Sequence, residues 1–415
     1  PVDPWLMGII TAASGRRDSY QVPVALAEAG LLAAHVTDQY LPDHLQPLLA
    51  HWKPGPGSSW LGRLRRRHHP QLPSRLVHCS RRLVLTQLAQ RVWPALSQRW
   101  SDDQDPISWS ALRLAQRKDA SLLLHMGYAH YAFMAEPRQR RSRGLVQYHP
   151  HIAESARILL ADLERYPALS DAREQLRIDA QDPTNAEELE RADLVVCNSQ
   201  FTARTCALLG VNPELLRVIP FGIQPLPTPA SKPSTRELGC CRFLFVGSGL
   251  HRKGLHHLLE AWRNAQLQHS KLTLVCRFVD PQIRSNFSLP EGVELQSAMS
   301  QQQLEELYSA ADVFVLPSLV EGFGYVYLEA LARGCFCIGT ENTGLPDIAA
   351  AGATRLVQAA DPAQLTQTLQ DVEEQAFSQG FDRQAIAASI RPWTWSRFRR
   401  DLVGATQQYL LRGEP

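Results

Sequence analysis

Residues 317–334 read PSLVEGFGYVYLEALARG, which predicts the end of a strand, a loop with two glycines and then a helix. Gly322 and Gly324 allow backbone dihedral angles that other residues avoid, and they let a ligand approach the main chain closely. The helix that follows presents unpaired N–H groups and the positive end of its dipole at its first turn. These features together predict a phosphate-binding site.

Two carboxylates accompany this predicted phosphate site. Glu321 lies in the loop beside the site, and Glu329 lies about two turns into the helix. Because a carboxylate repels a phosphate, neither side chain is suited to hold the phosphate itself. We therefore expect both to accept hydrogen bonds from hydroxyl groups, which a sugar and a ribose both carry.

A second strand, glycine loop and helix start occur at residues 243–254, which read FLFVGSGLHRKG. The adjacent cations Arg252 and Lys253 could neutralise a diphosphate, the arginine as a fork and the lysine as a point charge. The spacing matches neither a Walker A loop nor the Rossmann G-x-G-x-x-G pattern. Taken alone, this loop is equally consistent with a surface turn that carries solvated cations.

The two units together resemble the retaining glycosyltransferases of family 4 (group 1), which have the GT-B fold. The spacing from Glu321 to Glu329 inside the Pro-Ser-x-x-Glu-Gly-Phe-Gly pattern is that family's most recognisable stretch. ADLVVCNSQF at residues 192–201 and VIPFGI at residues 218–223 resemble further segments of the family. The resemblance extends from about residue 188 to about residue 347 and is thin over the first 120 residues or so.

The resemblance implies roles for individual residues. Glu321 would contact donor-sugar hydroxyls, Glu329 the nucleotide ribose, and Arg252 with Lys253 the diphosphate. Ser248 stands where the family commonly has an arginine, so that role would either pass to Arg252 or be weaker. The full set of donor-binding residues implied is Gly15, Gly247, Ser248, Arg252, Lys253, Glu321, Gly322, Phe323, Gly324 and Glu329.

The first half of the chain offers fewer candidates. Gly15, in TAASGRR at residues 11–17, resembles the family's early glycine loop, although the usual tandem glycines are absent. His125 ends a predicted strand where similar enzymes place a catalytic histidine beside the transferred sugar. His149 is the competing choice, and a purely structural histidine at this strand end is an equally open reading. The catalytic set implied is His125, Glu321, Arg252 and Lys253.

The pattern along the whole chain predicts an α/β protein. Apolar bursts of four to six residues alternate with amphipathic stretches, as in βαβ units that form a mostly parallel sheet. Strands are expected at residues 6–10, 122–125, 144–148, 194–197, 242–246, 272–278, 313–316 and 336–339. With the resemblance, this predicts two Rossmann-like doubly wound domains that face each other across a cleft.

The domain boundary is expected at a proline-rich linker within residues 220–233. The first domain, residues 1–222, would be the acceptor side, and the amphipathic helix within residues 394–415 would pack back on it. The second, residues 223–393, would bind the nucleotide sugar. Closure of the two domains on donor binding is the expected motion.

Composition restricts partners only weakly. The net charge of +2, from 43 basic and 41 acidic residues, neither requires nor excludes an anionic partner. Two arginine-rich clusters, within residues 63–69 and 138–143, predict solvated basic faces, with peripheral contact to the inner face of a membrane as the alternative. No nucleic-acid recognition motif accompanies them.

Targeting signals and cysteine spacing lead to one expectation about the compartment. No apolar run is long enough to span a membrane, and the start of the chain lacks a secretory-signal pattern. Eight cysteines without disulfide-framework spacing suit a reducing compartment, so a cytoplasmic protein is expected.

No metal or tightly bound cofactor is expected from spacing. No Cys or His pairs lie at zinc-ligand distances along the chain. The triplet at residues 103–105, Asp-Gln-Asp, lies in a polar stretch and not at a predicted strand end.

The function implied is a retaining hexosyltransferase that uses a UDP-, GDP- or ADP-sugar and a glycan, lipid or small-molecule acceptor. Two alternatives remain: a phosphorylase or epimerase of the same fold, and a sugar- or nucleotide-binding protein without transfer activity.

Overall fold

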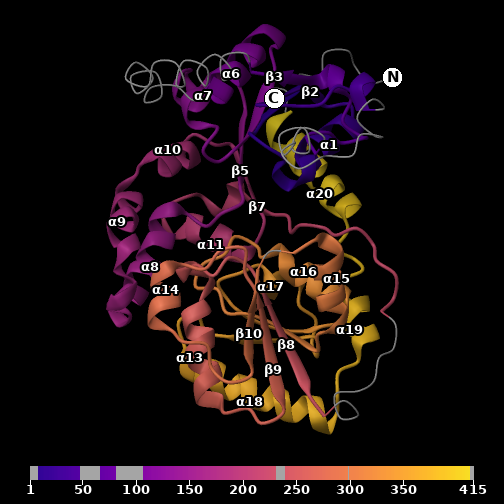
Figure 1. Cartoon of the computed structure of the whole chain (residues 1–415). Coiled ribbons are helices and arrows are strands. Elements are labelled where there is room, and N and C mark those ends of the chain that lie inside the picture. Colours follow the sequence, from indigo (N-terminus) through magenta and orange to yellow (C-terminus); the bar gives the residue numbers. More distant parts are fainter. Residues whose placement is uncertain (1–7, 47–65, 81–105, 230–238, 298, 412–415) are drawn as a thin grey trace.

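The computed structural model describes residues 8–46, 66–80, 106–229, 239–297 and 299–411. Within these residues two parallel β-sheets, each covered by helices, lie one after the other along the molecule (Figure 1). The first sheet has the strand order β3-β2-β1-β4-β5-β6-β7, and the second has the order β10-β9-β8-β11-β12-β13. This arrangement confirms the predicted α/β class with two doubly wound halves.

The strands of the first sheet are β1 (Ile9–Ala12), β2 (Leu32–Thr37), β3 (Val77–Cys79), β4 (Ser121–His125), β5 (Arg143–Gln147), β6 (Leu194–Cys197) and β7 (Leu216–Val218). The helices associated with them are α1 (Gln21–Glu28), α6 (Pro106–Lys118), α7 (His130–Met134), α8 (Ile152–Arg165), α9 (Arg173–Gln181), α10 (Thr184–Glu190) and α11 (Gln200–Leu208). Every strand pair in this sheet is parallel.

The strands of the second sheet are β8 (Cys241–Val246), β9 (Ser270–Val275), β10 (Val293–Gln296), β11 (Val313–Leu316), β12 (Phe336–Thr340) and β13 (Thr354–Val357). Its helices are α13 (Leu255–Ala265), α14 (Pro281–Asn286), α15 (Gln301–Ala310), α16 (Tyr325–Ala332), α17 (Leu345–Ile348), α18 (Pro362–Ser378) and α19 (Arg383–Ser389). These pairs are also parallel.

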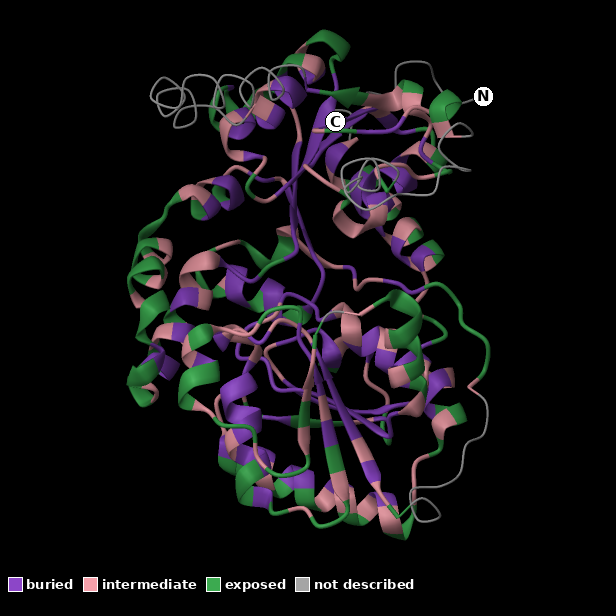
Figure 2. Cartoon of the chain, in the orientation of Figure 1, coloured by how far each residue is buried: buried purple, intermediate pink, exposed green. Residues whose placement is uncertain are grey.

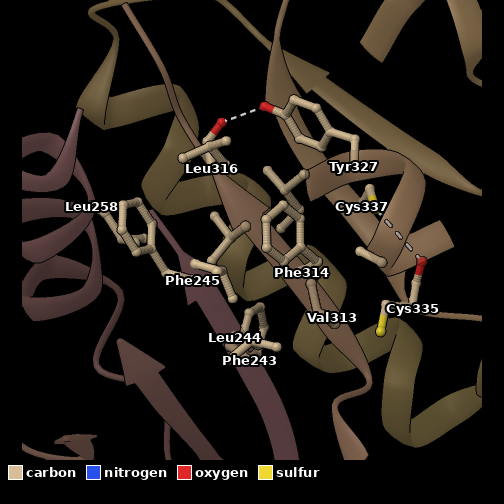
Figure 3. Close-up of a cluster of buried hydrophobic side chains, with 14 of the residues drawn as sticks. Phe243, Leu244, Phe245, Leu258, Val313, Phe314, Leu316, Tyr327, Cys335 and Cys337 are labelled. Carbon is tan, nitrogen blue, oxygen red and sulfur yellow. Dashed lines mark hydrogen bonds between the residues drawn. The ribbon is translucent and has the colours of Figure 1, made fainter. Parts of the chain in front are cut away.

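The central strands are apolar because helices cover both of their faces. All residues of β4, β6, β11 and β12 are buried, as Figure 2 shows for the interior of each sheet. Figure 3 shows this core in the second half, where Phe245 and Phe314 lie on neighbouring strands and the Tyr327 hydroxyl donates to the Leu316 carbonyl at 2.6 Å. Continuous apolar strands of this kind are typical of parallel sheets.

The predicted and observed strands differ in their bounds and in number. The strand expected at residues 6–10 lies at Ile9–Ala12, so its predicted bounds were wrong. Five strands were missed: β2, β3, β7, β10 and β13. Among these, β3, β10 and β13 are short edge strands with exposed positions, and they lack the apolar burst that the prediction required.

The last helix, α20 (Trp395–Leu410), returns to the first sheet. Figure 1 shows this yellow helix beside the indigo α1. Phe398 and Leu402 are buried in the same apolar cluster as Val22 and Leu123. Arg399 forms an ion pair with Glu28 of α1 at 2.8 Å.

The chain therefore passes between the two halves twice, and the two passages lie side by side. Ile223 and Thr394 form a parallel bridge, and the Ile223 N–H donates to the Trp393 carbonyl at 2.9 Å. A Cβ atom on Gly222 would overlap the backbone of Thr394. Residues 230–233 of the predicted linker lie outside the described residues.

The second arginine-rich cluster is a solvated face only in part: Arg138 and Arg140 are exposed as predicted, whereas the buried side chains of Arg141 and Arg143 correct the prediction. Arg143 is fully buried in β5, and its Nη2 donates to the carbonyls of Glu136 and Pro137, each at 2.8 Å. Arg141 is paired with the Glu136 carboxylate at 2.5 Å. Because these two guanidinium groups are buried and already hydrogen-bonded, they cannot contribute to binding at a membrane surface.

The first cluster is described only in part. Arg66 is exposed, whereas Arg67 pairs with Asp38 at 3.2 Å. Residues 63 and 65, and the triplet at residues 103–105, lie outside the described residues. Among the helices that are described, none has the length and apolar character needed to cross a bilayer.

Candidate functional site

The loop between β11 and α16 carries the predicted carboxylate and glycines. Gly324 caps α16 with φ of 80°, a left-handed conformation that favours glycine. No side chain caps the N-terminus of α16, so its first N–H groups stay open to an anion. A Cβ atom on Gly322 would overlap the carbonyl oxygen of Tyr148, so this glycine lets the loop touch the first half of the molecule.

The second glycine loop lies directly beside the first. It contains the 3₁₀ helix η7 (His251–Lys253), and the N–H of Leu319 donates to the Arg252 carbonyl at 2.9 Å. Gly254 has φ of 67°, and a Cβ atom there would overlap the Pro317 carbonyl oxygen. Backbone contacts therefore fix the two loops against each other at the ends of β8 and β11.

Glu321 is the centre of the charges on these loops. Arg252 Nη1 donates to Glu321 Oε2 at 3.1 Å, and Lys253 Nζ donates to the same oxygen. Burial opposes the charge on Glu321, but Lys253 and Arg252 together hold the pKa of this carboxyl below its usual range. The three predicted residues thus come together, and both cations are paired with the carboxylate.

The remaining donor-side residues occupy the surrounding positions. Gly247 follows β8, and its N–H donates to the Val275 carbonyl at 3.1 Å. Ser248, which replaces the family arginine, is half-buried, while the Arg252 side chain is 40% exposed and can turn toward a ligand. Glu329 accepts a hydrogen bond from Tyr308 at 3.2 Å, and burial raises the pKa of its carboxyl.

Phe323 joins this loop to the other half through edge-to-face contacts between aromatic rings. Its ring lies 5.1 Å from that of Phe221 in the passage between the halves, and Phe221 lies 4.7 Å from Tyr148. Ser199 Oγ, at the N-terminus of α11, donates to the Gly322 carbonyl at 2.5 Å. The donor loop is therefore anchored on the first half by apolar and polar contacts together.

The first half contributes Gly15 and His125 in different ways. Gly15 has φ of 82°, and its N–H donates to Asp38 Oδ1 at 2.9 Å. His125 is buried, donates from Nδ1 to the Ala12 carbonyl at 3.3 Å, and lies edge-on to Tyr148. Burial lowers the pKa of His125 to about 3, so its imidazole is neutral. Its Nε2 has no hydrogen-bond partner within the described residues.

His149, the competing histidine, is exposed at the edge of the site. Glu321, Arg17, Arg252 and Lys253 are near enough to act on it electrostatically. His149 therefore lies among the donor-side charges, whereas His125 lies behind Tyr148. Two polar residues that follow β4 already have partners: the Arg17 guanidinium lies over the Tyr128 ring at 5.5 Å, and His130 pairs with Glu187 at 2.6 Å.

Sequence reasoning missed Asp18. Its Oδ2 accepts hydrogen bonds from the Val22 N–H at 3.0 Å and from the Tyr148 hydroxyl at 3.3 Å. Burial raises the pKa of Asp18 to about 7. Asp18, Ser19 and Tyr20 have consecutive φ values of 43°, 54° and 64°, and such strain in non-glycine residues is typical of functional sites. The only available signal was an acidic residue shortly after Gly15.

Comparison with known proteins adds three findings. Residues 240–375 match the family described as glycosyl transferases group 1. The phosphatidylinositol N-acetylglucosaminyltransferase gpi3 subunit of Schizosaccharomyces pombe is 27% identical over 176 residues, which are 40% of this chain and 37% of that protein. The MMP alpha-(1->4)-mannosyltransferase of Mycolicibacterium hassiacum is 26% identical over 185 residues, which are 43% of this chain and 44% of that protein.

The matches to these relatives span less than half of their length. The solved structure of Anabaena HepE in complex with UDP and glucose extends the likeness over the whole chain. It superposes with a TM-score of 0.56 at 14% identity and covers 97% of this chain and all of that one. At this identity the superposition establishes a shared fold.

Proposed function

The chain belongs to the group 1 glycosyl transferases and has the GT-B fold, and from this premise we propose that it transfers a hexose from a nucleoside diphosphate sugar to an acceptor hydroxyl. One observation carries the proposal: Arg252 and Lys253 converge on Glu321 where two glycine loops meet. A donor brings both kinds of partner that this group needs, a diphosphate for the cations and sugar hydroxyls for the carboxylate.

The charges support a specific division of labour during transfer. As the sugar leaves, negative charge grows on the diphosphate, and the open N-terminus of α16 with Arg252 and Lys253 would stabilise it. Glu321, released from the cations, would accept hydrogen bonds from the sugar. Glu329 would accept from the ribose, as the family resemblance implies.

The acceptor would enter from the first half. Asp18 and Tyr148 form a hydrogen-bonded pair next to the donor loop, and a carboxyl with a pKa of about 7 can exchange a proton near neutral pH. We propose two further acceptor-side groups: His125, which is neutral and whose Nε2 has no partner among the described residues, and His149, which lies near Glu321. UDP is the first nucleotide to test, because HepE is a protein of this fold solved with UDP.

Donor binding is tested by thermal unfolding with UDP-, GDP- and ADP-sugars. A donor at 100 times its Kd adds about 2.7 kcal/mol to the free energy of unfolding. Lys253→Ala and Glu321→Ala should abolish the shift for that nucleotide family. Lys271→Ala, an exposed lysine on β9, is the matched control and should keep it. Absence of a shift with every nucleotide in the unmodified protein would contradict the proposal.

Transfer itself is tested separately. Release of the nucleoside diphosphate is followed with the donor that binds, in the presence of candidate acceptors that carry free hydroxyls. Sugar transfer with retained anomeric configuration, seen by NMR of the product, is the expected result. If the donor binds but no nucleoside diphosphate is released with any acceptor tested, the protein is a nucleotide-sugar-binding protein and the proposed transfer is wrong.

A further inference from the structure

A second group of chemically reactive side chains lies behind the donor loops, where α8 crosses η7 and α13. Asp162 comes from α8, His251 from η7, and His256 and His257 from the first turn of α13. All four side chains are at most 8% exposed. Among the described residues, Asp162, His256 and His257 form the one group of three metal-ligand side chains whose ligand atoms lie within 4.8 Å of one another.

All three imidazoles direct Nε2 toward the carboxylate of Asp162. His257 Nε2 lies 2.8 Å from Asp162 Oδ1, and His256 Nε2 lies 2.9 Å from Asp162 Oδ2. His251 Nε2 lies 2.7 Å from the same Oδ2. Convergence of ring nitrogens and a carboxylate oxygen on a buried point is the donor set that zinc and similar divalent cations prefer.

The neighbours of His257 determine which of its ring nitrogens carries a proton. The Tyr166 hydroxyl lies 2.7 Å from Glu260 Oε2 and 3.3 Å from His257 Nδ1. An ionised carboxylate can only accept, so the tyrosine proton goes to Glu260, and His257 Nδ1 must carry the proton that reaches the tyrosine oxygen. The lone pair on Nε2 of a neutral His257 then faces Asp162 Oδ1. This contact is repulsive unless a cation or another proton lies between the two atoms.

A metal satisfies this arrangement better than an extra proton. A charged imidazole is costly at this position, because all three histidine side chains are at most 8% exposed. The chain from Glu260 through Tyr166 to His257 is the outer hydrogen bonding that orients metal-binding histidines in proteins. With a divalent cation, neutral imidazoles and the carboxylates of Asp162 and Glu260, the formal charges of the group sum to zero.

We propose that Asp162, His256 and His257 bind a zinc-class divalent cation, with His251 as a positioning residue that orients the Asp162 carboxylate. Asp162 precedes β6 of the first sheet, and the histidines follow β8 of the second. The cation would therefore tie α8 to the helix start that carries Arg252 and Lys253. Its role is a clamp behind the donor loop, and the inference stands whether or not the protein transfers sugars.

The first test is the metal content of the full chain, produced without a histidine tag and analysed by mass spectrometry. About one zinc per chain is expected. Dialysis against a chelator should remove it and lower the Tm, and Zn²⁺ but not Mg²⁺ should restore the Tm. X-ray absorption should show nitrogen and oxygen neighbours only. No metal in the purified protein together with no 1:1 Zn²⁺ binding would overturn the proposal.

Variants separate the ligands from their surroundings. Asp162→Asn and His257→Gln keep the side-chain shapes and should lose stoichiometric zinc, whereas His251→Gln should weaken zinc binding by about 10- to 100-fold. The exposed His78→Ala is the matched control and should keep full metal content. If the ligand variants fail to fold, zinc titration of the unmodified apo protein against a competing chelator decides the question. Full zinc retention in folded Asp162→Asn would also contradict the assignment.

Discussion

The loops at the ends of β8 and β11 differ from the loop after β1 in how their backbone conformation is achieved. In the two loops of the second half, left-handed conformations fall on glycines, Gly254 and Gly324, and the charges beside them are paired. In the first half, three consecutive non-glycine residues from Asp18 onward hold such conformations, and the half-buried Asp18 carboxyl has no cation bonded to it among the described residues. The loops at the ends of β8 and β11 are thus locally relaxed, whereas the loop after β1 depends on surrounding structure to hold it in place.

This contrast has a functional meaning under the proposal. Nucleotide donors share a diphosphate, so one relaxed loop design serves many enzymes. Acceptors differ, and a strained, buried loop can be reshaped by the residues around it. Variants on the two sides should therefore have different effects. Donor-side variants should alter the charge or the packing of the loops, whereas acceptor-side variants should alter the pH dependence and the stability of the fold.

The largest effect is expected for Glu321→Gln. The change keeps the shape but removes the charge that holds Arg252 and Lys253, and it weakens acceptance from sugar hydroxyls. By analogy with the loss of one charge-stabilising group, kcat/KM should fall on the order of 100- to 1,000-fold. Steady-state rates with the identified donor measure this. Glu306→Gln, an exposed glutamate on α15, should keep the parent's rate; equal losses in both variants would show that the effect is not local.

Gly322→Ala should be the next largest. The added Cβ overlaps the Tyr148 carbonyl, so the loop must move away from the first half. Overpacking of this kind costs about 1–3 kcal/mol of the free energy of unfolding, measured by denaturant titration. Gly404→Ala, in α20 with open space around it, should instead stabilise by about 0.5–1 kcal/mol. A neutral Gly322→Ala would mean that the two halves do not meet here in solution.

Glu329→Gln should have a smaller effect that is confined to the donor. The carboxylate would lose part of its hydrogen bonding to the ribose, and a hydrogen bond to a charged group contributes about 1.5–3 kcal/mol. We expect KM for the donor to rise about tenfold with kcat little changed. A fall in kcat with unchanged KM would place this residue in the transfer step and not in ribose binding.

A change in the pH dependence of stability is expected for Asp18→Asn. Because burial raises the pKa of Asp18 to about 7, the folded protein binds more protons at this group than the unfolded chain between about pH 4 and pH 7. This carboxyl therefore makes the parent less stable as pH rises through that window. The difference in Tm, variant minus parent, should therefore increase from pH 4 to pH 7 and remain constant above pH 7. Parallel Tm curves would show that Asp18 is not buried as described.

Much of the fold could be predicted because the core strands are recognisable in the sequence as apolar runs. The core strands β4, β6, β8, β11 and β12 are apolar runs, and six of the eight predicted strands lie within two residues of the observed bounds at both ends. The edge strands could not be found in the same way, because one face of each meets solvent. Arg143 was placed in a basic face for a related reason: only its tertiary partners, the carbonyls of Glu136 and Pro137, make its burial tolerable.

The candidate donor site was largely readable from the chain. Arg252, Lys253, Glu321, Gly322 and Gly324 lie in two short segments, and each strand, glycine loop and helix start is governed by residues within a few positions of one another. Local sterics and helix-end chemistry operate over that range, so neighbouring residues suffice to specify them.

Groups built from distant segments were decided by the tertiary structure alone. Asp162 meets three histidines that lie 89 to 95 positions away, and Asp18 meets Tyr148 130 positions away. No spacing rule along the chain reports such contacts, because they depend on how α8 docks against α13 and how β1 and β5 lie in one sheet. Motifs local to the chain were therefore visible in the sequence, whereas the buried charges acquired their partners, and with them their pKa values and chemistry, only when the two sheets packed together.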